Sequence, residues 1–204
     1  VAMVRMEIDS SAFEAWECEP CTIGFELVKL RDLIGLAEQG DLIEMNYDEN
    51  DGRVNIQVGE INRTIRPLDR ATMLEPRVPD VDLQSSVKLS AIKFSRALRA
   101  AKQVGDLATI SLNAQSFGVN VSGDTDTVNV SYDAGELQDL VCDGPVKSQY
   151  SLSLLYPMAK RMEAIVDSVA LYFNENHPLR LEFEFADGAG RCVYFLAPRI
   201  EGDA

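Results

Sequence analysis

Cys18 and Cys21, in the stretch Cys-Glu-Pro-Cys, are the first residues whose type and spacing could support chemistry. Thiols at C-x-x-C spacing supply half of a tetrahedral zinc site, which then needs a second pair of ligands. The other two cysteines, Cys142 and Cys192, are far apart in the sequence, and Cys142 recurs at the position of Cys18 in an internal repeat. We therefore predict no metal site and interpret the thiols as reduced groups that pack within the fold.

The remaining candidates for catalysis are one histidine and two neighbouring glutamates. His177 lies in the turn sequence Asn-Glu-Asn-His-Pro-Leu, where solvent exposure is the expected role, and one histidine cannot build a triad or a His-based metal site. Glu182 and Glu184 look like paired carboxylates, but strand alternation places both in water while Leu181 and Phe183 point inward. Phosphate-loop, dinucleotide-binding and zinc-protease motifs are absent from the sequence. We therefore predict no catalytic site and no cofactor.

Positive charge is concentrated in one segment of an acidic chain. The 204 residues have a net charge of −14, whereas residues 87–105 contain five basic residues and no acidic one. Since this segment carries +5, the rest of the chain carries −19. Ser90 can cap a helix here, with an apolar stripe made of Ala91, Phe94, Leu98 and Ala101. A basic helical face on an acidic body is suited to duplex phosphate, bound by charge without base readout.

The composition is typical of a globular protein with one large domain or two small ones, since 46% of residues are hydrophobic and 25% are charged. No run approaches the roughly eighteen apolar residues of a membrane span, and no signal peptide opens the chain. A core of this size needs no disulfides. We expect a cytoplasmic protein with no membrane partner.

Hydrophobic periodicity divides the chain into helices, strands and one linker. Residues 10–20 are expected to form a short strand and loop in which Phe13 and Trp16 join the core, and a helix within 25–40 is expected to stop at Gly40. Residues 69–83 have two prolines and no period, which indicates an extended linker. The other expected strands are 1–9, 41–48, 53–59, 62–68, 107–112, 117–123, 127–133, the hairpin 168–187 and 191–198, with a helix at 153–166.

An internal repeat organises these elements. Residues 4–9 parallel 128–133, Cys18 parallels Cys142, residues 25–28 parallel 150–153, and residues 46–50 parallel 172–176. The offset stays between 124 and 126, so one strand–helix–hairpin–strand plan is used twice around the linker. The second copy begins at Val87, and nothing precedes Val4 to match its opening helix and strands. We therefore expect about forty further residues before Val1 in the natural protein, for a total of about 245.

With the repeat and the linker in view, the chain resembles the DNA sliding clamps of the proliferating cell nuclear antigen family, in an archaeal form. The resemblance covers essentially the whole chain. Its most specific pieces are the ending YFLAPRIE, the helix FSRALRAAKQVGD, the linker end PDVDL and the hairpin NENHPLRLEFEFADGAGRCVYFLAP. Their order and spacing are more specific than any one of them alone.

The resemblance implies an α+β clamp fold, with two similar domains that each place antiparallel sheets outside and helices inside a ring. The domains would be 1–68 and 84–204, joined by the linker 69–83. Members are non-enzymatic homotrimers that encircle double-stranded DNA without sequence specificity. They tether proteins that carry a PIP box, a short turn with one aliphatic and two aromatic anchors, such as DNA polymerase, the clamp loader, flap endonuclease and ligase. The location would be cytoplasmic and nucleoid-associated, or nuclear in a eukaryote.

Three sets of residues follow from the resemblance. The DNA-facing positions are Lys93, Arg96, Arg99, Lys102, Lys160, Arg161, Lys29 and Arg31. The partner-peptide pocket would consist of Met3, Val78, Leu83, Pro178, Phe195, Ala197, Pro198 and Ile200. The subunit interface would be antiparallel strand addition between two edge strands, with Ile61, Arg63 and Ile65 on one and Val128, Val130 and Tyr132 on the other.

Two other functions remain open at this stage. A subunit of a checkpoint-type clamp ring would share the fold without assembling with copies of itself. A small acid–base enzyme on a duplicated fold would require a pocket with convergent carboxylates.

Overall fold

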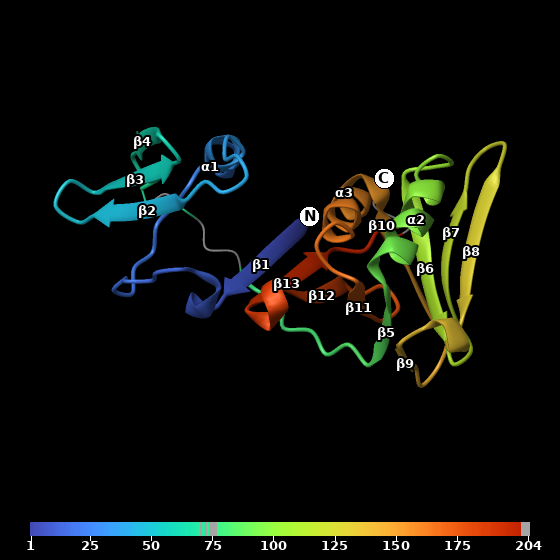
Figure 1. Ribbon diagram of the computed structural model, residues 1–204. Coiled ribbons are helices and arrows are strands. Elements are labelled where there is room, and N and C mark those ends of the chain that lie inside the picture. The colour runs from blue at the N-terminus through green and yellow to red at the C-terminus, as the bar shows by residue number, and fades with distance from the viewer. Residues whose placement is uncertain (70, 72, 74–76, 201–204) are drawn as a thin grey trace. The chain divides into compact units, whose positions relative to one another are not determined.

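The computed structural model describes residues 1–69, 71, 73 and 77–200, and it contains two compact units (Figure 1). Unit 1 comprises Val1–Trp16 and Val78–Ala204, and unit 2 comprises Glu17–Arg77. Linker positions 70, 72 and 74–76 lie outside the described residues, and the predicted domain limits at 68 and 84 stay predictions. In the described part of the chain, no helix is long and apolar enough to cross a membrane.

Among its described residues, unit 1 contains two antiparallel sheets and two α-helices. One sheet has the order β1-β13-β12-β11-β5-β9, and the other has the order β10-β6-β7-β8. The elements of this unit are β1 Ala2–Ile8, β5 Ser85–Ser90, α2 Ala91–Ala101, β6 Leu107–Asn113, β7 Ser116–Ser122, β8 Thr127–Asp133, β9 Asp139–Val141, β10 Val146–Ser151, α3 Leu152–Met162, β11 Ser168–Phe173, β12 Leu179–Phe185 and β13 Gly190–Leu196.

The described part of unit 2 contains one α-helix and one three-stranded antiparallel sheet of order β2-β3-β4. Its elements are α1 Leu27–Ile34, β2 Ile43–Asp48, β3 Arg53–Val58 and β4 Ile61–Ile65. The hairpin predicted at residues 41–59 is present, and Gly52 adopts a φ of +65° in its turn, a conformation that favours glycine. A small buried cluster holds the unit together: Leu33, Val54, Ile56 and Val58.

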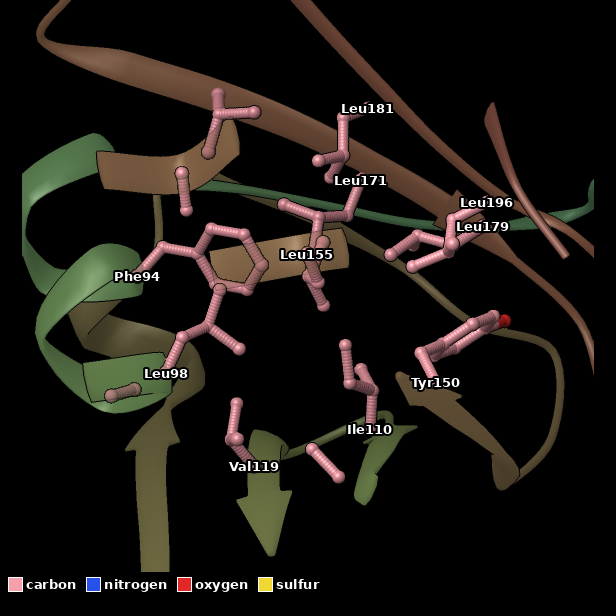
Figure 2. Packing of buried hydrophobic residues seen from close by; sticks show 14 of the residues in the cluster. Phe94, Leu98, Ile110, Val119, Tyr150, Leu155, Leu171, Leu179, Leu181 and Leu196 are labelled. Carbon is pink, nitrogen blue, oxygen red and sulfur yellow. The ribbon is translucent and has the colours of Figure 1, made fainter. Parts of the chain in front are cut away.

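A single hydrophobic core fills unit 1. Figure 2 shows Phe94 and Leu98 of α2 facing Leu155 of α3, with strand residues from both sheets around them. The predicted stripe of α2 is buried, and the Ser90 hydroxyl accepts a hydrogen bond from the Lys93 backbone N–H at 3.5 Å. The helical spacing of the apolar residues in α2 therefore determines which of its faces packs against the sheets, and the charged face stays in solvent.

The internal repeat is present in the backbone as well as in the sequence. Gly24 pairs with Leu68 in unit 2 through an isolated bridge, and Gln149 pairs with Arg199 in unit 1 through the same kind of bridge. Asp9 and Asp133 each cap a short 3₁₀ helix that follows an edge strand. Unit 2 thus repeats α3, β11, β12 and β13 of unit 1, and β1 repeats β8.

Four local predictions are wrong. Phe13 and Trp16 are not core residues, because the chain after β1 forms a 3₁₀ turn at Ser10–Ala12 instead of a strand. Both side chains are exposed, and their ring centroids lie 4.8 Å apart. Helix α1 ends at Ile34 rather than near Gly40, since Gly35 caps it in a short turn.

The other two wrong predictions concern side-chain environments. Cys18 is exposed rather than packed, whereas its repeat counterpart Cys142 is partly buried against the core. Glu182 is not simply in water, because ion pairs with two arginines hold its half-buried carboxylate on the sheet. Leu181 and Phe183 do point inward as expected.

Candidate nucleic-acid and partner-binding site

The predicted DNA-facing residues of unit 1 lie on or at the end of two helices that pack side by side, α2 and α3 (Figure 1). Arg96, Arg99, Lys160 and Arg161 are exposed, and among the described residues none of these four side chains forms an ion pair. An unpaired guanidinium or ammonium group in solvent keeps its full charge for an external anion. These four residues, which we call the cationic helix face, are the strongest candidates for phosphate contact.

Lys93, in the first turn of α2, and Lys102, at its C-cap, are partly neutralised by acidic partners. Lys93 pairs with Glu136 at 3.2 Å, and Lys102 pairs with Asp106. The Lys93 ammonium lowers the pKa of Glu136 below its ordinary value, so the carboxylate stays charged. Lys93 also lies 5.6 Å from the centroid of the Tyr132 ring. Both lysines would have to leave an intramolecular partner before contacting DNA fully.

Lys29 and Arg31 belong to α1 in unit 2, and both are exposed but paired locally. Lys29 contacts Glu26 at 2.7 Å, and Arg31 contacts Asp32 at 2.6 Å. The positive charge of α1 is therefore offset on its own surface, which makes these two residues weaker candidates than the cationic helix face.

A groove of about 280 Å³ lies on the outer side of the β1-β13-β12 sheet, beside linker residues 78–81. Phe195 and Val78 both line it, and Met3 lies directly across from Phe195 in the β1–β13 register. Two of the predicted pocket residues therefore line the groove, and Met3 pairs with one of them without lining it. The remaining predicted pocket residues do not line this groove: Leu83, Pro178, Ala197, Pro198 and Ile200.

Several groove residues were missed by the sequence reasoning. Val193 and Arg5 face each other across β1 and β13, and they lie two positions from Phe195 and Met3. Strand alternation from Phe195 would have identified Val193, because residues i and i+2 share a face. The contribution of Arg5 depends on the pairing of strands nearly two hundred residues apart, and no local pattern signals that.

Charged groups form one end of this groove. Arg180 and Arg191 both contact Glu182 at 3.0 Å, and the Arg180 guanidinium lies 4.2 Å from the centroid of the Tyr172 ring. The Glu182 carboxylate raises the pKa of Arg191 above its ordinary value. The groove therefore has an apolar end at Phe195 and a charged end at Glu182, a combination that suits a peptide with apolar anchors and flanking polar groups.

The strands predicted to join subunits are both at sheet edges. Within the described residues, β4 has only β3 as a neighbour and β8 has only β7. Ile61 is exposed, while Val130 and Tyr132 are partly buried against the core of unit 1. The edges are as predicted, and their pairing between chains stays a prediction.

Comparison with known proteins decides the family. Residues 77–199, more than half of the chain, match the model for the proliferating cell nuclear antigen C-terminal domain. A DNA polymerase sliding clamp from Methanosarcina mazei is 37% identical over 204 residues, which is 100% of this chain and 82% of that protein. The chain belongs to the proliferating cell nuclear antigen family.

Other members of this family extend the comparison. A DNA polymerase sliding clamp from Natronomonas pharaonis is 34% identical over 206 residues, covering 100% of this chain and 83% of that one. The A. fulgidus member, solved with the C-terminal region of FEN-1 bound, superposes with a TM-score of 0.89 at 26% identity, over 100% of this chain and 82% of that one. The expected α+β clamp fold is thereby confirmed, with antiparallel sheets and few helices.

Proposed function

We propose that this protein is a DNA polymerase sliding clamp that encircles duplex DNA inside the cell and tethers replication and repair proteins to it. Membership of a family whose archaeal relatives are named DNA polymerase sliding clamp supports this function. The observation that carries it at the level of residues is the cationic helix face, which has no acidic partners among the described residues. No catalytic function is proposed.

The chemistry of such a face fits movement along DNA. Unpaired cations that contact phosphate oxygens displace condensed counterions, so binding is salt-dependent and insensitive to sequence. Because no base edge has to be read, each register along the duplex has nearly the same energy. The net charge of the chain is −14, so the surface outside the basic helices is strongly acidic and repels DNA.

A homotrimer is the assembly that we propose, and the duplication supports a specific subunit contact. Within unit 1, β1 pairs with β13, and Met6 lies opposite Cys192. The counterpart of β1 is the edge strand β8, and the counterpart of β13 is the edge strand β4. Transferring the register through the repeat places Val130 of one subunit opposite Ile61 of the next.

Tethering would use the groove beside Phe195. The A. fulgidus relative, whose title names a bound C-terminal region of FEN-1, supports a peptide from a flap endonuclease as one occupant. PIP-box segments of DNA polymerase, clamp loader and ligase would bind the same groove, with their aromatic anchors at its apolar end.

Charge reversal on the cationic helix face tests the function. Replacing Arg96 and Arg99 by Glu is expected to reduce clamp-dependent stimulation of a cognate DNA polymerase at least tenfold at moderate salt, because phosphate contacts become repulsive. The matched control replaces Lys88 and Lys147 by Glu, which changes the net charge equally on exposed strand positions. The assignment would be contradicted if neither variant lost polymerase stimulation, or if both lost it to the same extent.

A further inference from the structure

The thiols of Cys18 and Cys21 are close to each other and open to solvent. Their Sγ atoms are 3.9 Å apart, and both residues are exposed. They lie in a stretch without regular secondary structure that follows β1 and precedes α1 in the sequence. A disulfide requires an S–S separation of about 2.05 Å, so a side-chain rotation and a small backbone adjustment in a loop suffice.

The other two cysteines do not share this environment. Cys192 is buried in the core, and burial raises the pKa of its thiol. Cys142 is partly buried, and its Sγ donates to the Gly144 carbonyl oxygen at 2.7 Å. Reagents in solution therefore reach Cys18 and Cys21 first.

A metal ion is a poor explanation for the pair. Among the described residues, no cluster of three or more His, Cys, Asp or Glu side chains could hold a metal. The Cys18 Sγ instead donates to the Glu19 carbonyl oxygen at 3.0 Å, and its pKa is raised, chiefly by the hydrogen bond with Cys21. Both observations favour a neutral dithiol in the reduced protein.

We propose that Cys18 and Cys21 are a reversible oxidation site, which closes to an intramolecular disulfide by exchange with low-molecular-weight disulfides. The thiolate of one cysteine attacks the reagent, forms a mixed disulfide and releases one thiol. The second cysteine attacks the protein sulfur of that mixed disulfide and releases the second thiol. The two cysteine protons end on the two released thiols, and the reagent disulfide is reduced as the protein dithiol is oxidised.

The adjacency of the thiols makes the second step fast compared with escape of the mixed disulfide. A partner sulfur held at 3.9 Å acts as an intramolecular nucleophile, so its effective concentration exceeds that of free thiol in solution. Oxidation would then crosslink the segment between β1 and α1 and leave the core of unit 1 unchanged. This inference does not rest on the clamp function.

Equilibration of the whole protein in glutathione redox buffers tests the proposal, with differential alkylation and peptide mass analysis as the readout. The expected result is a Cys18–Cys21 disulfide that forms in oxidised and opens in reduced buffer. The Cys21→Ser variant should instead accumulate a glutathione adduct on Cys18, at least tenfold above that of the unmodified protein. The Cys142→Ser control should behave like the unmodified protein.

Three results would overturn the proposal. The first is a pair that stays a dithiol in fully oxidised glutathione. The second is a stable glutathione adduct in the protein that has both Cys18 and Cys21. The third is a disulfide from Cys18 to another chain rather than to Cys21.

Discussion

Units 1 and 2 use the same helix-and-hairpin plan but differ in how well they bury it. Leu152 begins α3 and is fully buried, whereas its counterpart Leu27 begins α1 and is 76% exposed. Leu171 of β11 is fully buried, whereas its counterpart Met45 of β2 is 47% exposed. The residues at these positions are therefore apolar in both copies, but their side chains are buried only in unit 1.

The difference shows which contacts complete the plan. In unit 1, β5 pairs with β11 and α2 packs against α3, so a second layer covers the repeated elements. In the described part of unit 2, β2 pairs with β3 alone. A helix and a hairpin can thus form from local signals, while burial depends on elements elsewhere in the fold.

The largest expected effect concerns the edges that the repeat leaves unpaired, β4 and β8. If they pair as β1 and β13 do, cysteines at Ile61 and Val130 lie directly opposite each other between subunits. Oxidation of the Ile61→Cys, Val130→Cys variant should give covalent trimers on a denaturing gel, because opposite Cα atoms lie about 5 Å apart.

The matched control for this crosslink moves one cysteine by two positions. The Arg63→Cys, Val130→Cys variant places the thiols diagonally, about 7–8 Å apart, and should crosslink several-fold more slowly. Faster crosslinking of the control would show that the register is not inherited from β1 and β13. A single-chain mass by light scattering would contradict self-assembly and favour a mixed, checkpoint-type ring.

The next largest effect is expected from truncating counterpart leucines, because the cost in unfolding free energy should differ between the two units. Leu152→Ala is expected to cost about 2–5 kcal/mol of unfolding free energy, since it leaves a cavity in a close-packed core. Leu27→Ala should cost less than about 0.5 kcal/mol, because an exposed side chain loses little burial. Urea unfolding followed by circular dichroism measures both, and equal costs would show that Leu27 is covered in solution.

Alkaline pH should weaken unit 1 by a comparable amount. Burial raises the pKa of Tyr150 and of Tyr194 to about 12, against an ordinary value of 10. The protonated phenols therefore stabilise the fold fully below pH 10, and this contribution is lost as the pH rises toward 12. Each shift corresponds to about 3 kcal/mol.

Unfolding measurements between pH 9 and 12, with tyrosinate absorbance recorded in parallel, check this expectation. Tyr150→Phe should reduce the pH dependence, although it also removes the hydrogen bond that Tyr150 donates to the His177 carbonyl oxygen. Stability that is constant through pH 12 would contradict the assigned burial.

The smallest effect is expected at the strand ends that differ between the copies. Phe195 of β13 corresponds to Thr64 of β4, so the repeat places an aromatic anchor in one unit and a polar residue in the other. Phe195→Ala should weaken a PIP-box peptide by about 1–3 kcal/mol, as for other buried anchors. Thr64→Ala is the matched control and should leave affinity unchanged. Calorimetry that finds no difference between them would remove Phe195 from the site.

Local patterns predicted most of the fold but not its pairing. The apolar stripe of α2, its Ser90 cap and the hairpin turn at Gly52 are all determined by neighbours within a few residues. The end of α1 at Gly35 was missed because Leu36 and Ala37 continue an apolar pattern through a turn. The exposure of Trp16 was missed because aromatic residues in a loop give no periodic signal.

The candidate site was predictable to the extent that charge is visible in sequence. Arg96 and Arg99 were identified correctly as exposed cations, but nothing in the sequence shows that Glu136 neutralises Lys93 from more than forty residues away. The groove similarly depends on the pairing of β1 with β13. Long-range ion pairs and strand neighbours are determined by the tertiary fold. Residue types alone therefore could not rank the candidate DNA-contacting and groove residues.

Retention on DNA of defined topology tests the central claim most directly. The protein would be loaded onto nicked circular duplex by an archaeal clamp loader, and the complex would be isolated by gel filtration before and after a restriction enzyme linearises the DNA. Encirclement predicts that the protein stays on the circle and leaves within minutes once ends are available. Equal retention on circular and linear DNA would contradict a sliding clamp.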